Sequence, residues 1–334
     1  MPVRKTETRI PLGAAASDLG EASVAADGRC ALVSFITSPL VVNRENTYVV
    51  FVTDAGLAAQ AQSFEWSFSE NGGSASTQST QVGEAVYSPQ DTGSLSVTVR
   101  ILDSSNNEQA NLSLTQDIAP LNPILEGLIV SAGDQPGPGV GNPDVVRELV
   151  NDYSVYYQGV NLQTPEPGNS FLHFLFSMVF DGAQQRKPDQ RKQHVDDLAG
   201  ALNDQTTDFA SLIAEGAGVS AVRLPLLAMT AGVAGAGSPA SLTWTELPDV
   251  PAQHDSAEVQ LCQAVAGLDE NVRIDLFTLA RFPKSNITAC GRMVEGLRDH
   301  YFAGTSFSDV LTGMSGTRAQ WIVRHYREGP LSRS

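Results

Sequence analysis

Two groups of histidine and acidic residues have the side chains of a divalent-metal site. His254 and Glu258 lie four residues apart, so one helix face could carry both, with Asp255 beside them. The second group consists of His194, Asp196 and Asp197. Each group offers only two or three ligands without a partner cluster, and no HExxH motif occurs. Acidic residues at a helix start also favour the helix dipole, so we predict no metal site.

The segment Gly313-Met314-Ser315-Gly316 contains a serine that could act as a nucleophile. This segment falls short of the G-x-S-x-G pattern and follows no obvious strand. Ser315 better fits a turn between two helices. The five histidines show no sequence relation to a nucleophile; they are His173, His194, His254, His300 and His325. We therefore predict no catalytic residue in this segment.

An acid pair for glycoside hydrolysis, such as Glu215 with Asp249, stays open because carboxylates come together only in the fold. With 37 acidic residues in the chain, such a pair is easily proposed. Whether the chain is an enzyme is therefore not decided, although no motif demands catalysis.

A glycine-rich segment at residues 128–141, LIVSAGDQPGPGVG, has the outline of a phosphate-binding loop before a helix. The G-x-G-x-x-G pattern is not completed, because Asn142 and Asp144 stand where the third glycine belongs, and no Gly-Lys-Ser/Thr occurs. Two prolines remove amide donors, and Asp134 would repel an anion. We predict a linker here and no cofactor.

Residues 307–326 have the outline of a helix-turn-helix, with a glycine turn and a second helix that carries Arg318 and Gln320 early. Residues 284–334 hold seven basic and four acidic residues. Asp309, however, sits where a small residue usually packs between the two helices, and a helical hairpin has the same outline. The basic end could equally dock on residues 30–117 of this chain, which hold nine acidic and two basic residues.

The composition indicates an acidic protein of two or three domains. The chain has 334 residues, of which 42% are hydrophobic, and its 37 acidic and 21 basic residues give a net charge of −16. Because binding to phosphate backbones needs clustered Lys and Arg, we do not expect a nucleic-acid partner. Charged residues make up only 17%, which argues against long disorder and coiled coil.

No segment has the pattern of a signal peptide or a spanning helix. Glu7, Arg9, Asp18 and Glu21 interrupt every apolar run near the N-terminus. The longest apolar stretches fall short of the roughly 20 residues that a spanning helix needs. We expect cytoplasmic synthesis without a signal peptide, no membrane insertion, and release as part of a particle.

The three cysteines, Cys30, Cys262 and Cys290, show no CxxC spacing. A Cys262–Cys290 bridge stays open, but buried free thiols fit a chain without an export signal better.

Short β-rich runs at regular spacing begin at Cys30 and indicate an antiparallel sandwich. Leu95, Val97, Val99 and Ile101 alternate with polar residues in one of these runs. The runs are 30–37, 46–53, 63–69, 83–88, 94–102 and 110–118. From Asp144 the apolar spacing becomes helical. Helices are predicted at 169–182, 190–203, 206–215, 219–230, 255–266, 270–281, 285–301, 306–313 and 316–328, with a short strand at 242–245.

The β-rich part resembles a PKD-type immunoglobulin-like domain over about residues 30–117. The likeness rests on FEWSFSENGG at 64–73, AVYSP at 85–89, GSLSVTV at 93–99 and DSSNN at 103–107. The family's W-D-F-G-D-G core is W-S-F-S-E-N here, so its acidic positions are partly replaced. The resemblance implies a spacer, adhesion unit or carbohydrate-facing accessory, with Trp66 and Tyr87 as core aromatics.

The predicted fold class is multidomain β + α, an antiparallel Ig-like β-sandwich followed by a mainly α-helical domain. The predicted divisions are an N-terminal extension at 1–29, the sandwich at 30–118, a Pro/Gly-rich linker at 119–143, and a helical domain at 144–334 that splits near 231–254.

From these features we expect a non-enzymatic structural or docking protein, an accessory component of a larger assembly such as a phage-tail-like contractile injection particle. Its partners would be other proteins of the assembly, bound through the helical domain, with surface polysaccharide as a second partner of the Ig-like domain. The alternative is a polysaccharide-active hydrolase with an Ig-like accessory domain.

Overall fold

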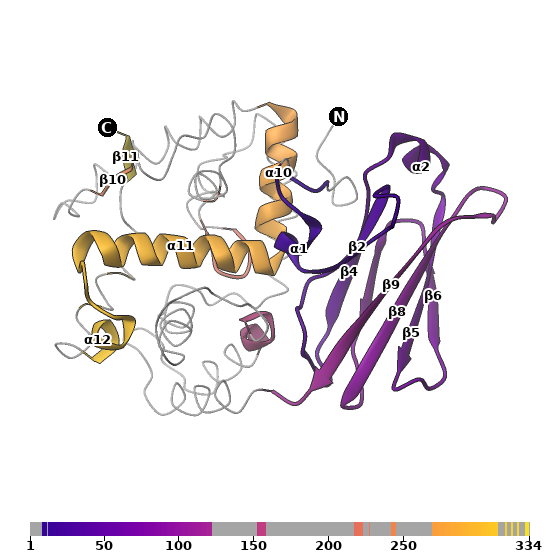
Figure 1. Cartoon of the computed structure of the whole chain (residues 1–334), viewed down its shortest axis with the longest axis horizontal. Coiled ribbons are helices and arrows are strands. Elements are labelled where there is room, and N and C mark those ends of the chain that lie inside the picture. The colour runs from indigo at the N-terminus through magenta and orange to yellow at the C-terminus, as the bar shows by residue number, and fades with distance from the viewer. Residues whose placement is uncertain are drawn as a thin grey trace.

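The computed structural model describes residues 9–11, 13–121, 152–157, 217–222, 227, 242–244, 269–312, 318, 322, 326 and 331–333. Two β-sheets, of four and five strands, make up most of this part of the chain, and the helices of the C-terminal part lie beside one of them (Figure 1).

The four-stranded sheet, called sheet A, has the strand order β1-β2-β4-β7 with antiparallel neighbours. Its strands are β1 (Glu21–Val24), β2 (Cys30–Ser34), β4 (Asn46–Val52) and β7 (Glu84–Tyr87). The sheet therefore begins at residue 21, within the stretch that the sequence assigned to an N-terminal extension.

The five-stranded sheet, called sheet B, has the order β3-β9-β8-β5-β6. Its strands are β3 (Leu40–Val41), β5 (Ser63–Glu70), β6 (Ser76–Thr80), β8 (Gly93–Leu102) and β9 (Glu108–Ala119). All neighbours are antiparallel except β3 and β9, which run parallel. This parallel edge departs from the wholly antiparallel arrangement expected from the sequence.

Alternating side chains of sheet B pack against sheet A. Leu95, Val97, Val99 and Ile101 are fully buried, as their alternation predicted. Trp66 is also buried, and the ring of Phe68 stacks on that of Tyr87 at 4.5 Å between centroids. Ser96 and Arg100, which alternate with these residues on β8, are exposed on the opposite face.

Two long helices follow in the C-terminal part, α10 (Glu270–Arg281) and α11 (Pro283–Tyr301). The Asp269 carboxylate accepts the backbone N–H of Asn271 and caps α10, while Pro283 suits the first turn of α11. The shorter elements are α1 (Ala16–Leu19), α2 (Ala55–Gln60), α12 (Phe307–Thr312) and the antiparallel pair β10 (Leu242–Trp244) and β11 (Leu331–Arg333). In the described part of the chain, no helix combines the length and the apolarity needed to cross a membrane.

The predicted fold class is wrong. The described chain is mostly β, and its C-terminal helices share one hydrophobic core with the sheets instead of forming a separate, mainly helical domain. The reason lies in sheet A, where every residue of β2 and nearly every residue of β4 is buried. One face of these strands meets sheet B, and the other is covered by Phe282, whose ring lies 4.5 Å from that of Phe35 and 5.4 Å from that of Phe51.

Candidate functional site

Glu70, the last residue of β5, is the acidic residue of the W-S-F-S-E-N segment. Its carboxylate faces the loop that follows β7. Oε1 accepts the hydroxyl of Tyr87 at 2.8 Å and the backbone N–H of Gln90 at 2.9 Å. Oε2 accepts the backbone N–H of Asp91 at 2.9 Å. The carboxylate therefore clamps the chain's own loop.

These donors shift the pKa values of both side chains. Burial acts to raise the pKa of Glu70, but the backbone N–H groups of Asp91 and Gln90 and the Tyr87 hydroxyl outweigh it and lower that pKa. Burial, together with the bond to Glu70, raises the pKa of Tyr87 to about 12. Within the described residues, no group of three or more His, Cys, Asp and Glu side chains could hold a metal ion.

The neighbouring residue, Asn71, completes this clamp. Its Oδ1 accepts the backbone N–H of Ser94 at 2.9 Å, and its Nδ2 donates to the carbonyl of Thr92 at 3.1 Å. Gly93 has φ +134°, and a Cβ at that position would lie 1.9 Å from Asn71 Oδ1. Only glycine fits there, so the Glu70–Asn71 turn and the loop at 87–94 form one fixed structure.

Replacing Glu70 with glutamine should destabilise the protein by about 1 kcal/mol at neutral pH, because a charged acceptor of backbone N–H groups is lost. A lowered pKa in the folded state means that this stabilisation is present above the unfolded-state pKa near 4.5 and is lost as the pH falls through the folded-state value. The difference between wild type and Glu70→Gln, measured by urea unfolding, should therefore shrink in acid.

Glu65→Gln is the matched control, since the Glu65 carboxylate lies on the same strand and, among the described residues, binds the exposed Arg100 at 2.9 Å. It should change stability little at any pH. A difference between wild type and Glu70→Gln that stays constant down to strongly acidic pH would contradict the clamp.

A second polar cluster is buried between the segment 217–222 and α11. Asn286 accepts the backbone N–H of Ser220 at 2.8 Å and donates to the carbonyls of Ala217 at 2.9 Å and Ala280 at 3.3 Å. The hydroxyls of Ser220 and Tyr157 lie 2.7 Å apart. Asn286, Ser220 and Tyr157 are each at most 1% exposed, so this serine is held inside the core.

The thiol of Cys290 belongs to the same cluster. Complete burial raises its pKa to about 12, although hydrogen bonds with Tyr326 and Ser220 oppose the shift. Cys30, buried at the start of β2, also has a raised pKa, chiefly because of burial. Both are free cysteines, as the sequence favoured. Cys262 lies outside the described residues.

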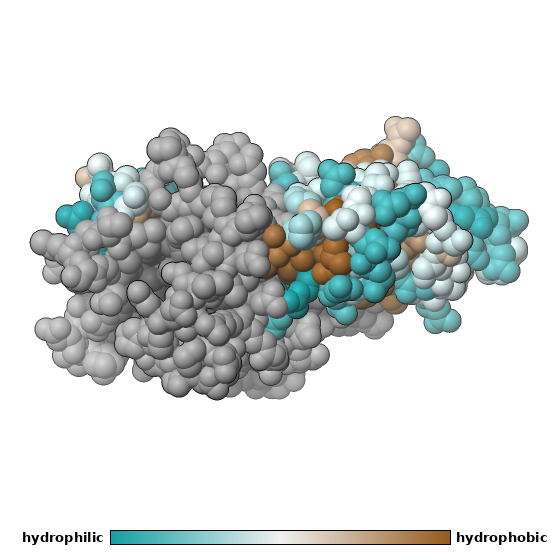
Figure 2. All heavy atoms as spheres, turned by 90° about the horizontal axis from the view of Figure 1, so that it is seen from below, coloured by the Kyte–Doolittle hydropathy of each residue, from teal (hydrophilic) through white to brown (hydrophobic). Residues whose placement is uncertain are grey.

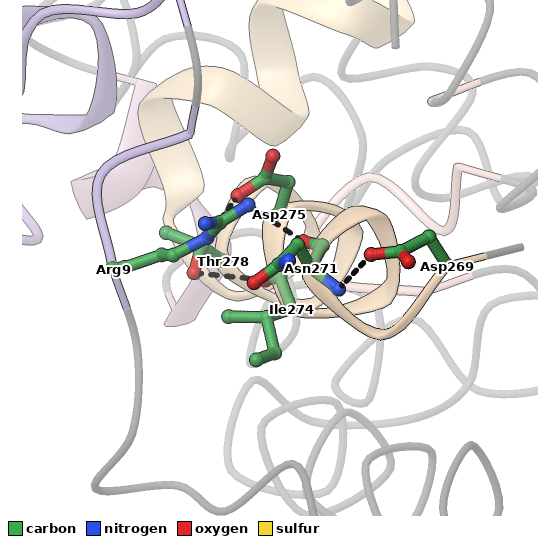
Figure 3. Close-up of polar contacts among 6 residues, drawn as sticks. All are labelled: Arg9, Asp269, Asn271, Ile274, Asp275 and Thr278. Carbon is green, nitrogen blue, oxygen red and sulfur yellow. Dashed lines mark hydrogen bonds and ion pairs between the residues drawn. The ribbon is translucent and has the colours of Figure 1, made fainter. Parts of the chain in front are cut away.

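Ion pairs join the N-terminal segment and the sheets to the later helices. Arg9 donates from Nε to Asp275 Oδ1 at 2.8 Å and from a terminal nitrogen to the carbonyl of Asn271 at 2.9 Å, so this segment is fastened to α10 (Figure 3). Lys284 in α11 donates to the carbonyl of Ser17 at 2.6 Å. The residues expected to form an extension thus brace the helices.

Two further ion pairs hold the sheets to the rest of the chain. Arg281, at the end of α10, binds Glu84 on β7, and its guanidinium lies 5.4 Å from the centre of the Phe35 ring. Arg44 binds Asp152 at 3.2 Å. These pairs connect parts of the chain that are far apart in sequence, and their role is to hold the folded chain together.

Most candidates from the sequence lie outside the described residues. These are the 128–141 segment, His194 with Asp196 and Asp197, Glu215 with Asp249, His254 with Glu258, and Gly313–Gly316. The hydrolase alternative therefore stays a prediction. In the helix-turn-helix outline, Phe307 and Val310 of α12 are buried, as are Ile322 and Tyr326. The Glu70 clamp and the Ser220–Asn286 cluster were missed, because their partners are too far apart in sequence to make a motif.

No protein-family model matches the chain, and no curated protein matches it. A solved structure described as a polysaccharide lyase aligns with 87% of this chain and 47% of its own, at 8% identity and a TM-score of 0.20. The chain spans about half the length of that structure, and a score this low carries no argument. The PKD-type resemblance stays a prediction.

Proposed function

We propose that the chain is a non-enzymatic structural and docking protein, an accessory component of a larger assembly such as a phage-tail-like particle. One observation carries the proposal: the described sheets and helices share a single core, and the outer face of sheet B is uncovered by any described element (Figure 1). A single packed core with a broad open face suits a part that is built into an assembly.

The outer face of sheet B is formed by small hydroxyl side chains in rows across the strands. One row contains Thr77, Ser67, Thr98 and Ser113, and the next contains Ser69, Ser96 and Thr115, as the register places them opposite one another. The few charges on this face include Arg100, which binds both Glu65 and Glu108. On a chain of net charge −16, the hydroxyl rows themselves carry no charge, so they would repel an acidic partner protein less than the charged surface does.

The native mass of the untagged protein in lysate tests the proposal. Sedimentation with mass spectrometry of co-migrating chains should place the protein in a megadalton fraction together with other proteins. The variant Ser67→Lys/Thr98→Lys should migrate less in that fraction while keeping its fold by circular dichroism. Migration of the wild type at or near its own mass would overturn the proposal and direct work to polysaccharide hydrolysis.

A deletion of the C-terminal part is a poor alternative test. Phe282 covers Phe35 and Phe51 of the N-terminal part, so removal of the helices would expose a buried face of sheet A. Point variants on the outer face of sheet B leave this core intact.

A further inference from the structure

Strand β6 is an edge strand of sheet B with one unpaired side. It pairs with β5 through a regular register from Phe64 opposite Thr80 to Phe68 opposite Ser76. Within the described residues, no backbone group other than those of β5 bonds to the β6 backbone. Ser76, Thr77 and Ser79 are exposed, and β6 lies on the side of the molecule away from α10 and α11 (Figure 1).

This edge lacks the features that usually prevent pairing with another chain. Natural edge strands carry Lys or Pro, contain a bulge, are very short, or are covered. Residues 71–83 contain no charged residue and no proline, and the register with β5 shows no bulge. The surface of the β part is mainly white to teal, with some apolar atoms among them (Figure 2), and the exposed apolar residues near this edge are Val82 and Val86. The edge therefore offers main-chain hydrogen bonds, with Val82 and Val86 as exposed apolar residues beside them.

The other edges of the two sheets differ from β6. β3 has only two residues, and α1 lies next to β1. β7 lies next to β6, and its Val86 carbonyl already accepts the side chain of Gln78 from β6 at 3.3 Å, whereas the β6 backbone makes no backbone bond to β7. β6 is thus the edge at which a further strand would fit best.

We propose that β6 pairs antiparallel with β6 of a second copy of this chain, about a two-fold axis at Gln78. This inference deepens the proposed function by naming one contact of the assembly. The sequence Ser-Thr-Gln-Ser-Thr is nearly self-complementary in this arrangement, because Ser76 then faces Thr80 of the other copy and Thr77 faces Ser79. Cross-strand hydroxyl pairs of this kind stabilise antiparallel sheets.

Charge does not oppose a second copy at this strand. Two chains of net charge −16 repel each other over most of their surfaces, but no charged residue lies on the pairing strands. The nearest acid on the adjacent strand, Glu65, faces Ser79 across the register and is bound by Arg100 at 2.9 Å. Because a five-residue edge is small for an interface, we expect a weak dimer that forms with rising concentration.

Analytical ultracentrifugation of the purified full chain tests this pairing. The wild type should shift from monomer to dimer as its concentration rises through the micromolar range. Thr77→Lys/Ser79→Lys places like charges opposite one another in the dimer, and it should stay monomeric. Thr77→Glu/Ser79→Glu should also stay monomeric, and an equal mixture of the two variants should recover the dimer. The matched control, Ser113→Lys/Thr115→Lys, adds the same charge to exposed positions of β9 and should still dimerise.

Two outcomes would overturn the inference: a wild type that stays monomeric throughout, or a Thr77→Lys/Ser79→Lys variant that dimerises like the control. The test is independent of the lysate experiment. If purified protein dimerises through β6 but lysate protein sediments no faster than a dimer, the proposed larger assembly is contradicted and the strand pairing is supported. If lysate protein co-migrates with partners while the purified chain stays monomeric, the strand pairing is contradicted and the proposed larger assembly is supported.

Discussion

Replacing Phe282 with alanine is expected to lower the free energy of unfolding by about 3–5 kcal/mol. The Phe282 ring is completely buried between α10 and α11 and contacts Phe35 and Phe51 on the sheet side. Its removal would leave a cavity where the helices meet sheet A. The same residue ends α10 and precedes Pro283, so the backbone around the cavity has little freedom to collapse into it.

The consequence should extend beyond a lower midpoint. Urea unfolding can be monitored with two probes, the fluorescence of Trp66, which is buried in sheet B, and far-ultraviolet circular dichroism. In the wild type, the two probes should show coincident transitions. In Phe282→Ala, the helical signal should be lost at lower urea than the Trp66 signal, because the contact that couples them is weakened. The other tryptophans are replaced by phenylalanine in both proteins for this measurement.

Phe302→Ala is the matched control, since Phe302 is only partly buried and its ring contacts are with Tyr301 and Arg318 instead of the sheets. It should cost clearly less and leave the two transitions together. If Phe282→Ala costs no more than Phe302→Ala, the shared core is not what holds helices and sheets together.

Local patterns were sufficient to predict several elements. The alternation over 94–102 predicted β8 (Gly93–Leu102), because one side of that strand is polar and the other buried. The helices predicted at 270–281 and 285–301 correspond to α10 and α11. β6 was not predicted, since its Ser, Thr and Gln residues have no apolar partner set from which a period could be recognised.

The error in fold class came from a signal that was present but interpreted too narrowly. The runs CALVSF and TYVVFV are apolar at nearly every position, and a strand of that kind is buried on both faces. A two-layer sandwich buries only one face of each sheet, so a third layer had to cover sheet A. What the runs could not show is that Phe282, more than 200 residues later, supplies that cover.

The Ser220–Asn286 cluster illustrates the same limit for polar contacts. The two residues are 66 positions apart and belong to no motif. The glycine beside them, Gly218, is required because its φ is +71° and a Cβ there would lie 2.3 Å from the carbonyl oxygen of Ala280. From the sequence it is one of 29 glycines, and nothing marks it.

Asn286→Ala is expected to cost about 2–4 kcal/mol, because it leaves the backbone N–H of Ser220 and the carbonyl of Ala217 buried without their partner. The cost should appear first in the segment 217–222, which Asn286 fastens to α11. Hydrogen–deuterium exchange with mass spectrometry should show faster exchange of the peptide that contains Ser220, by a factor of about 30 or more if opening becomes easier by about 2 kcal/mol.

Thr288→Val serves as the control for Asn286→Ala. Thr288 lies on the same helix, and its hydroxyl donates to the carbonyl of Lys284 at 2.7 Å, where the lost bond can be replaced by the helix or by water. It should change stability by less than about 1 kcal/mol and leave exchange at Ser220 unaltered. Equal exchange in wild type and Asn286→Ala would mean that the segment is held by its apolar residues, Val219 and Val222, both buried, and that the polar cluster only satisfies groups already fixed in place.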